Sequence, residues 1–174
     1  MVDVQTLSGG GGAITISTPE AATSGTSIDF NSIPAGVRRI VIDFIGVSFN
    51  ANANPLLQIG AGSVATTGYV SSAGDYVPTA NFASSTAGFV LAGSAASLAV
   101  AGNLVTGTII LTLENASNGT WISSSNLGST GSSNNTGTGG GYKTLSGTLD
   151  RVRITTTAGT ATFDAGEINI SYES

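Results

Sequence analysis

The sequence predicts an all-β protein, an antiparallel β-sandwich of jelly-roll-like type built from about ten short strands. Short runs rich in Val, Ile, Thr and Phe alternate along the chain with Gly, Ser, Asn and Pro. No segment keeps a helical apolar period over three turns. The 174 residues suffice for one domain with a sizeable core. Short, closely spaced runs favour a sandwich or barrel over alternating βαβ units.

The expected strands follow one another along the whole chain. In chain order they are Ala13–Thr18, Ser27–Phe30, Val37–Phe49, Leu56–Ile59, Ala65–Ser71, Gly88–Ala92, Leu104–Glu114, Thr120–Ser124, Arg151–Thr157 and Glu167–Tyr172. The two longest show how the faces divide. Ile40, Ile42 and Phe44 share one side of the first, and Ile109 and Leu111 share one side of the second. These sides are expected to face the core.

Four consecutive glycines, Gly9–Gly12, separate the first residues from the first strand. The sequence thus divides into an N-terminal arm with a glycine hinge (1–12) and a β-sandwich domain (13–174). The arm begins without a basic or apolar stretch and does not resemble a signal peptide. Two interpretations stay open, a flexible leader and an arm that docks on another chain. In the second, the contacts are expected from Met1, Val2, Val4 and Leu7.

The segment Asn126–Gly141 consists almost entirely of Gly, Ser, Thr and Asn. We expect a long surface loop at one end of the sandwich, because these side chains cannot form a core. Two interpretations stay open: the loop has no specific function, or its tip contacts carbohydrate or another subunit. The candidate glycan or subunit contacts are Tyr69, Tyr76, Asn134, Asn135 and Tyr142. The single tryptophan, Trp121, is expected to be a core anchor.

The composition argues against an enzyme. The chain has no cysteine and no histidine, which excludes thiolate metal sites, cysteine nucleophiles and imidazole general bases. The carboxylates are scattered singly, so the pair that a glycosidase needs is not evident. We therefore expect no catalytic residue, no cofactor site and no metal-ligand cluster. A single Ca²⁺ held by loop oxygens remains an open alternative.

Neither nucleic acid nor a membrane is an expected partner. With five basic and ten acidic residues the chain has a net charge of −5 and no basic face for phosphates. The uncharged stretch Ala87–Val105 is long enough to be considered as a transmembrane helix. However, glycines and polar residues interrupt it, and no cation flanks it. Two short strands around a turn explain it better, so no membrane insertion is expected.

The middle of the chain carries very little charge. Between Asp75 and Lys143, Glu114 is the only Asp, Glu, Lys or Arg residue. A monomer normally uses surface charge to stay soluble and to keep strand edges unpaired. Interface cores, by contrast, are depleted in charge. We therefore expect the chain to self-associate, with a closed ring such as a homotrimer as the favoured form. A monomer with a neutral, hydroxyl-rich coat is the alternative.

Two regions of the sequence resemble a known domain. They are Ile28–Ile40 with Phe44–Ser48 and Leu57–Gly60, and Leu145–Thr156 with Phe163–Ile170. Together they resemble a domain found in structural proteins of tailed bacteriophages, of the tail-fibre or decoration type. The resemblance spans most of the chain, although Tyr76–Tyr142 matches only in character. It implies a virion component and supplies no functional residues.

These observations lead to an expected function and an alternative. The expected protein is a non-enzymatic structural component on the exterior of a tailed-phage virion, assembled in the host cytoplasm. It would be a capsid decoration or cement protein, or part of a short tail or head fibre. Its partners would be copies of itself and virion proteins such as the major capsid or tail protein. The alternative is a host-attachment domain that binds a surface polysaccharide.

Overall fold

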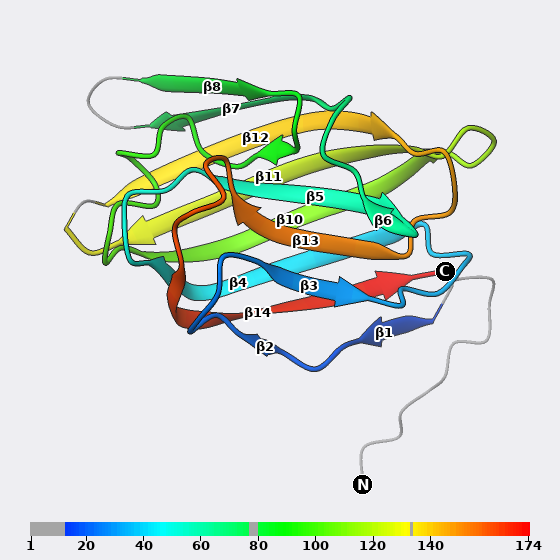
Figure 1. Cartoon of the computed structure of the whole chain (residues 1–174), viewed down its shortest axis with the longest axis horizontal. Coiled ribbons are helices and arrows are strands. Elements are labelled where there is room, and N and C mark those ends of the chain that lie inside the picture. Colours follow the sequence, from blue (N-terminus) through cyan, green and yellow to red (C-terminus); the bar gives the residue numbers. More distant parts are fainter. Residues whose placement is uncertain (1–12, 77–79, 133) are drawn as a thin grey trace, which may run out of the picture.

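The computed structural model describes residues 13–76, 80–132 and 134–174. These residues form two antiparallel sheets packed face to face, so the predicted β-sandwich is confirmed (Figure 1). The described residues contain fourteen strands, more than the ten expected. The strands that were not expected are mostly short ones at sheet edges.

The larger sheet has nine strands. In spatial order they are β1 (Ile14–Ile16), β14 (Phe163–Glu173), β4 (Arg39–Phe49), β10 (Leu104–Asn115), β11 (Thr120–Thr130), β12 (Asn135–Thr144), β7 (Val70–Tyr76) and β8 (Asn81–Ser85), with β2 (Glu20–Ala21) also paired to β14. Strands β1 and β8 are therefore the two far edges of this sheet. In Figure 1 it runs behind the smaller sheet, from β8 at the top to β1 and β2 at the bottom.

The smaller sheet has five strands. In order they are β3 (Ile28–Asn31), β13 (Arg151–Thr156), β5 (Pro55–Ala61) and β6 (Ser63–Val64), with β9 (Phe89–Val90) on the other part of β5. The chain alternates between the sheets, and the late strands β13 and β14 insert between early strands of each sheet. This interleaved order is that of a jelly roll. The hairpins β7–β8 and β11–β12 add further strands to the larger sheet, in addition to those of the jelly roll.

The core lies between the sheets, where the inward side chains of both meet. Ile40, Ile42 and Phe44 of β4 are at most 1% exposed, as the alternation in the sequence predicted. Ile109 and Leu111 of β10 are also fully buried and join the same apolar cluster. The alternating pattern therefore identified the inward side of the two longest strands correctly.

Two parts of the strand prediction were wrong. The strand expected at Ala65–Ser71 begins only at Val70 and continues to Tyr76. The segment Asn126–Gly141 is not a surface loop, because β11 runs on to Thr130 and β12 begins at Asn135. The two strands pair in continuous antiparallel register from Thr120↔Thr144 to Ser129↔Asn135.

Glycine is required on the inward side of β12 because other chain segments come very close there. A Cβ added at Gly139 would lie 2.9 Å from Ser125 Oγ and 3.0 Å from the Val90 carbonyl oxygen. At Gly140, on the outward side, the nearest atom to such a Cβ is 3.4 Å away. The inward glycines that resemble a loop are thus explained by close packing, of β9 on Gly139 and of β7 on Gly137 and Gly141.

Candidate functional site

The outward face of the nine-stranded sheet is the first candidate. Every exposed large hydrophobic side chain among the described residues belongs to a strand of this sheet. They are Ile14, Ile16, Ile45, Val70, Tyr76, Phe82, Leu104, Ile122 and Tyr142. Side chains alternate along a strand, so the residues next to buried ones lie on the outward side. Ile14 and Ile16 of β1 are outward as well, because they pair with Glu173 and Ser171 on the outward side of β14. We call this surface the large outer face.

Three of these side chains form one continuous row. Ile122 of β11 is paired with Tyr142 of β12, and Tyr142 is paired with Val70 of β7. They are 44%, 48% and 55% exposed, respectively. Directly paired residues on one face of a sheet have Cβ atoms about 5 Å apart, so the row is a single apolar strip across three strands. An exposed strip of this kind is typical of a surface that another molecule covers.

The large outer face divides by charge. The outward positions of β11, β12, β7 and β8 carry no charged side chain; they are Ser, Thr, Asn, Gly and the apolar residues above. Charges are found on β4 and β14 instead, where Arg39 Nη1 lies 3.8 Å from Glu173 Oε1. On β10, Thr108 Oγ1 donates a hydrogen bond to Asp43 Oδ1 at 2.9 Å. The part of the face built from β11, β12, β7 and β8 is therefore neutral, while β10 carries the exposed Glu114.

The smaller sheet has a different outward face, which we call the small outer face. Arg153 Nε donates to Asp29 Oδ1 at 2.6 Å and Arg153 Nη2 donates to Asp29 Oδ2 at 3.0 Å. This bidentate hydrogen bonding raises the pKa of Arg153. Arg151 pairs in the same way with Asp150, and this side-chain hydrogen bond holds the pKa of Asp150 below its usual value. The small outer face is thus polar, and its two arginines are each paired with a carboxylate of the same face.

A shallow groove of about 360 Å³ lies at one end of the large outer face. Tyr76 and Phe82, which are 70% and 81% exposed, both line it, with Gly74, Thr138 and Gly140 among its other lining residues. Two exposed aromatic rings beside backbone and hydroxyl groups suit a neutral, hydroxyl-rich ligand. Among the described residues that line the groove, Asp75 is the one that bears a carboxylate, and its side chain is buried.

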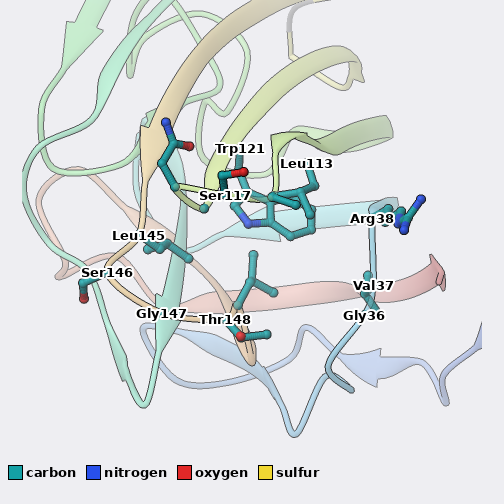
Figure 2. A pocket seen from close by; sticks show the side chains of 14 residues that line it. Gly36, Val37, Arg38, Leu113, Ser117, Trp121, Leu145, Ser146, Gly147 and Thr148 are labelled. Carbon is teal, nitrogen blue, oxygen red and sulfur yellow. The ribbon is translucent and has the colours of Figure 1, made fainter.

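A larger cleft of about 610 Å³ opens at one end of the sandwich (Figure 2). Three loops line it: the one before β4, the β10–β11 hairpin and the β12–β13 connection. Its apolar lining residues are Val37, Leu113, Trp121, Leu145 and Leu149, with Ala116 at the hairpin. Its polar lining comes from serine, threonine and asparagine side chains and one arginine, and no carboxylate contributes.

Trp121 lies in the wall of this cleft. It is 3% exposed, which agrees with the expected core anchor, and it belongs to the main apolar cluster. Figure 2 shows its indole nitrogen on the side of the ring toward Leu145, across the cleft. Arg38 stands at the opposite rim with its guanidinium directed outward. The cleft therefore combines an apolar wall, an indole edge and one cation at the rim.

Tyr69 is a core residue and has no surface for a ligand, which corrects its place among the candidate contacts. It is 1% exposed, its ring packs edge-on against Phe89, and Lys143 Nζ lies 5.4 Å from the ring centroid. Its hydroxyl oxygen accepts a hydrogen bond from Ile59 N–H at 2.8 Å and lies 2.9 Å from the Ala65 carbonyl oxygen. Burial raises the pKa of Tyr69 to about 12, partly offset by the hydrogen bond to Ile59.

The other candidate contacts do not form one cluster. Tyr76 and Tyr142 lie on the large outer face, six register positions apart along the β7–β12 pair. Asn134 is exposed at the end of the β11–β12 hairpin. Asn135 is half-buried, and its Nδ2 donates a hydrogen bond to the Ser97 carbonyl oxygen at 2.8 Å. Met1, Val2, Val4 and Leu7 lie outside the described residues.

A buried carboxylate, Asp75, lies on the inward side of β7 at 2% exposure. Its Oδ2 accepts hydrogen bonds from Ser94 N–H at 3.0 Å and from the Ser97 hydroxyl, while Oδ1 has no partner in the described part of the chain. These contacts fix the turn at 94–97 against the large sheet. Within residues 13–76, 80–132 and 134–174, no group of three acidic, histidine or cysteine side chains could hold a metal ion.

Of the nine exposed apolar residues of the large outer face, sequence reasoning named only Tyr76 and Tyr142 as candidate contacts; among the seven that it missed are Val70, Phe82 and Ile122. Ile122 was placed within an expected strand, and its alternation with Trp121 could have identified it as outward-facing. Phe82 gave no such signal, because the strand that carries it, Asn-Phe-Ala-Ser-Ser, does not alternate in hydrophobicity.

Comparisons with known proteins show no relationship: no family model, no curated protein and no solved structure matches the chain. In the described ranges, no helix has the length and apolar character needed to cross a membrane.

Proposed function

We propose that this chain is a non-enzymatic structural protein on the exterior of a tailed-phage virion, where copies of it associate through the large outer face. It would be mounted as a capsid decoration or cement protein, or as part of a short tail or head fibre. The resemblance of residues 28–170 to structural proteins of tailed phages supports the virion setting. The neutral, apolar outer face supports the self-association.

The observation that carries the proposal is the concentration of exposed apolar side chains on one face. A monomer would expose Val70, Ile122 and Tyr142 to water without any benefit. The uncharged outward surface of β11, β12, β7 and β8 covers roughly 500 Å² at standard strand spacing and rise per residue. This is more than half of the ~800 Å² that each partner contributes to a stable protein interface. The neutral part of the face thus supplies most of the area that one copy contributes to an interface with another.

The distribution of apolar residues favours a ring over a two-fold dimer. Ile14 and Ile16 lie at the β1 edge of the face, whereas Phe82 lies at the β8 edge. Contacts between unlike patches are head-to-tail, and they close into a ring when the rotation between subunits allows it. A homotrimer is the smallest such ring. In this arrangement residues 1–8 remain the candidate attachment arm toward a capsid or tail protein, through Met1, Val2, Val4 and Leu7.

Purified virions from the host that produces this protein provide the test. We expect mass spectrometry of gradient-purified particles to detect the chain in many copies per particle, and antibody labelling of intact particles to place it outside. Its absence from particles, or its presence only in the soluble lysate, would contradict the virion role.

The groove beside Tyr76 and Phe82 favours a second candidate function, host attachment through a neutral surface polysaccharide. Exposed aromatic rings can stack on sugars, and the surrounding hydroxyls can hydrogen-bond to them. A glycan array should then show saturable binding that Phe82→Ala abolishes and Asn31→Ala, on the small outer face, leaves intact. An array without hits would exclude this function.

A further inference from the structure

The cleft beside Trp121 is formed by three loops at one end of the sandwich. In Figure 1 the β10–β11 hairpin and the connection from β12 to β13 lie at the same end, and the loop before β4 completes the lining. The cleft volume of about 610 Å³ is within the range of sites that hold ligands, roughly 300–1,000 Å³. The cleft is separate from the apolar strip of the large outer face, because none of Ile122, Tyr142 and Val70 lines it.

The wall of the cleft is mainly aliphatic. Val37, Leu145 and Leu149 are 5%, 6% and 2% exposed, and the half-buried Leu113 is more accessible. Because Trp121 is only 3% exposed, its ring offers no open face on which a sugar could stack. Aliphatic side chains, by contrast, bind by packing against a wall of this kind. The wall therefore favours a ligand with a branched aliphatic group over a sugar ring.

The indole N–H of Trp121 is a hydrogen-bond donor that lacks an acceptor. It makes no hydrogen bond within the described part of the chain, although the residue is almost fully buried. Buried indole N–H groups usually have an acceptor. Figure 2 shows this nitrogen on the side of the ring toward Leu145, across the cleft. An acceptor oxygen placed in the cleft would therefore satisfy this donor.

The charge at the cleft is positive. Arg38 lines the cleft and is exposed, with its guanidinium at the rim (Figure 2). Arg39, Arg151 and Arg153 each pair with a carboxylate, whereas Arg38 has no ion pair within the described residues. Among the described residues that line the cleft, none bears a carboxylate. This local positive charge, in a chain of net charge −5, favours an anionic partner group.

We propose that the cleft binds a short acidic peptide segment of a partner protein. A branched aliphatic side chain of that segment packs against Val37, Leu113 and Leu145. A backbone carbonyl oxygen accepts a hydrogen bond from the Trp121 indole N–H, and an acidic side chain pairs with Arg38. An extended peptide supplies all three groups, whereas a fatty acid lacks the second acceptor and a neutral sugar lacks the anion. This binding site is distinct from the proposed subunit contact and does not depend on it.

Selection from a library of random heptapeptides on the immobilised full chain tests the proposed chemistry. The enriched sequences should carry Asp or Glu close to Leu, Ile or Val. On Arg38→Glu, which reverses the charge at the rim, the selection should enrich Lys or Arg in place of the acidic residue, because like charges repel across an interface. The matched control is Arg39→Glu, the same change at the next residue, which does not line the cleft. It should enrich the same acidic peptides as the unmodified chain.

The single tryptophan makes the contact with the indole measurable. The ¹H–¹⁵N spectrum of the full chain contains one indole signal, that of Trp121. Titration with one enriched peptide, synthesised with both ends blocked, should shift this signal to saturation. It should also slow the exchange of the indole proton with solvent at least about fivefold, because the proton then takes part in a hydrogen bond. Changing the acidic residue of the peptide to its amide should weaken binding about two- to fivefold, the effect of removing one exposed ion pair.

A substitution that fills the cleft provides an independent variant. Thr148 is exposed and lines the cleft, so Thr148→Phe should abolish peptide binding. Thr23→Phe, at an exposed threonine between β2 and β3, is the matched control and should bind the peptide like the unmodified chain. Circular dichroism establishes that each variant keeps its sheets. Tyr142→Lys should also bind the peptide unchanged, which separates a failure of the cleft from a failure of the subunit contact.

Three results would overturn the proposal. The first is a selection that enriches no acidic and aliphatic peptides, or enriches the same peptides on Arg38→Glu. The second is an indole signal that does not respond to the enriched peptide, or responds equally in Thr148→Phe. The third is an indole signal that responds only to added oligosaccharide or to sodium octanoate, which would assign the cleft to a sugar or to a fatty acid.

Discussion

The outward faces of the two sheets differ in whether their side chains have partners within the described part of the chain. On the small outer face, Arg153 and Arg151 each form bidentate hydrogen bonds with a carboxylate, and no large apolar side chain is exposed among its described residues. On the large outer face, the strip formed by Ile122, Tyr142 and Val70 is exposed, and among the described residues no charged side chain lies on the outward side of its three strands. The charged side chains of one face are paired within the described part of the chain, whereas the apolar strip of the other face is exposed to solvent.

This difference separates the segments whose charged side chains pair within the sandwich from the segments that we propose to take part in assembly. The charged side chains of the small outer face lie on or next to two of its strands, β3 and β13, at residues 28–31 and 150–156. The neutral half of the large outer face comes from the hairpins β7–β8 and β11–β12, which extend the larger sheet beyond the jelly-roll strands. The added hairpins thus carry the surface that we assign to subunit contact.

The largest effect is expected from the inward side of the same hairpins, where the sandwich is tightly packed. Gly139→Ala should lower the free energy of unfolding by about 1–3 kcal/mol, because the new Cβ would lie within 3.1 Å of Ser125 Oγ, the Val90 carbonyl oxygen and Ala73 Cβ. Gly140→Ala, one residue further and on the outward side, should be neutral or slightly stabilising. Urea denaturation measures both. Equal effects would contradict the assignment of inward and outward sides on β12.

An intermediate effect is expected at the contact between β5 and the start of β7. Tyr69→Phe should cost about 1–2 kcal/mol, because it leaves the Ile59 N–H without the hydroxyl that accepts its hydrogen bond. The raised pKa of Tyr69 also predicts a pH dependence. The folded state keeps this proton up to about pH 12, whereas the unfolded chain loses it near pH 10.

Stability should therefore be unaffected by this group below pH 10 and should fall as the pH rises from 10 toward 12, by up to about 1.4 kcal/mol per pH unit. Tyr69→Phe should remove this part of the decline, as measured by thermal unfolding across that range. A variant with the same alkaline decline as the unmodified chain would show that Tyr69 does not titrate as the buried hydroxyl implies.

The smallest effect is expected on the small outer face. Arg153→Ala should cost no more than about 1 kcal/mol, since about a third of each side chain in the Arg153–Asp29 pair is in contact with water. It should leave the association state unchanged. Chemical denaturation together with size-exclusion chromatography provides the measurement. A change in association state would assign this face, too, to subunit contact.

The sequence alone predicted the sandwich and the inward residues of the long strands, because β4 and β10 alternate between apolar and polar positions. It failed at β12, where Gly137, Gly139 and Gly141 face inward and no side chain shows the alternation. The Trp121 cleft forms because three loops, which lie before β4, after β10 and after β12, meet at one end of the sandwich. Such a meeting of distant segments is a consequence of topology, which local patterns do not contain.

Sedimentation velocity at micromolar concentration tests the assignment of the large outer face most directly. The account predicts that the unmodified chain sediments as a closed assembly several times heavier than the 17.1 kDa subunit. Tyr142→Lys should reduce it to single subunits, while Asn31→Lys, which places the same charge on the small outer face, should leave the assembly intact. A single-subunit mass for the unmodified chain, or assemblies equally insensitive to both lysines, would contradict it.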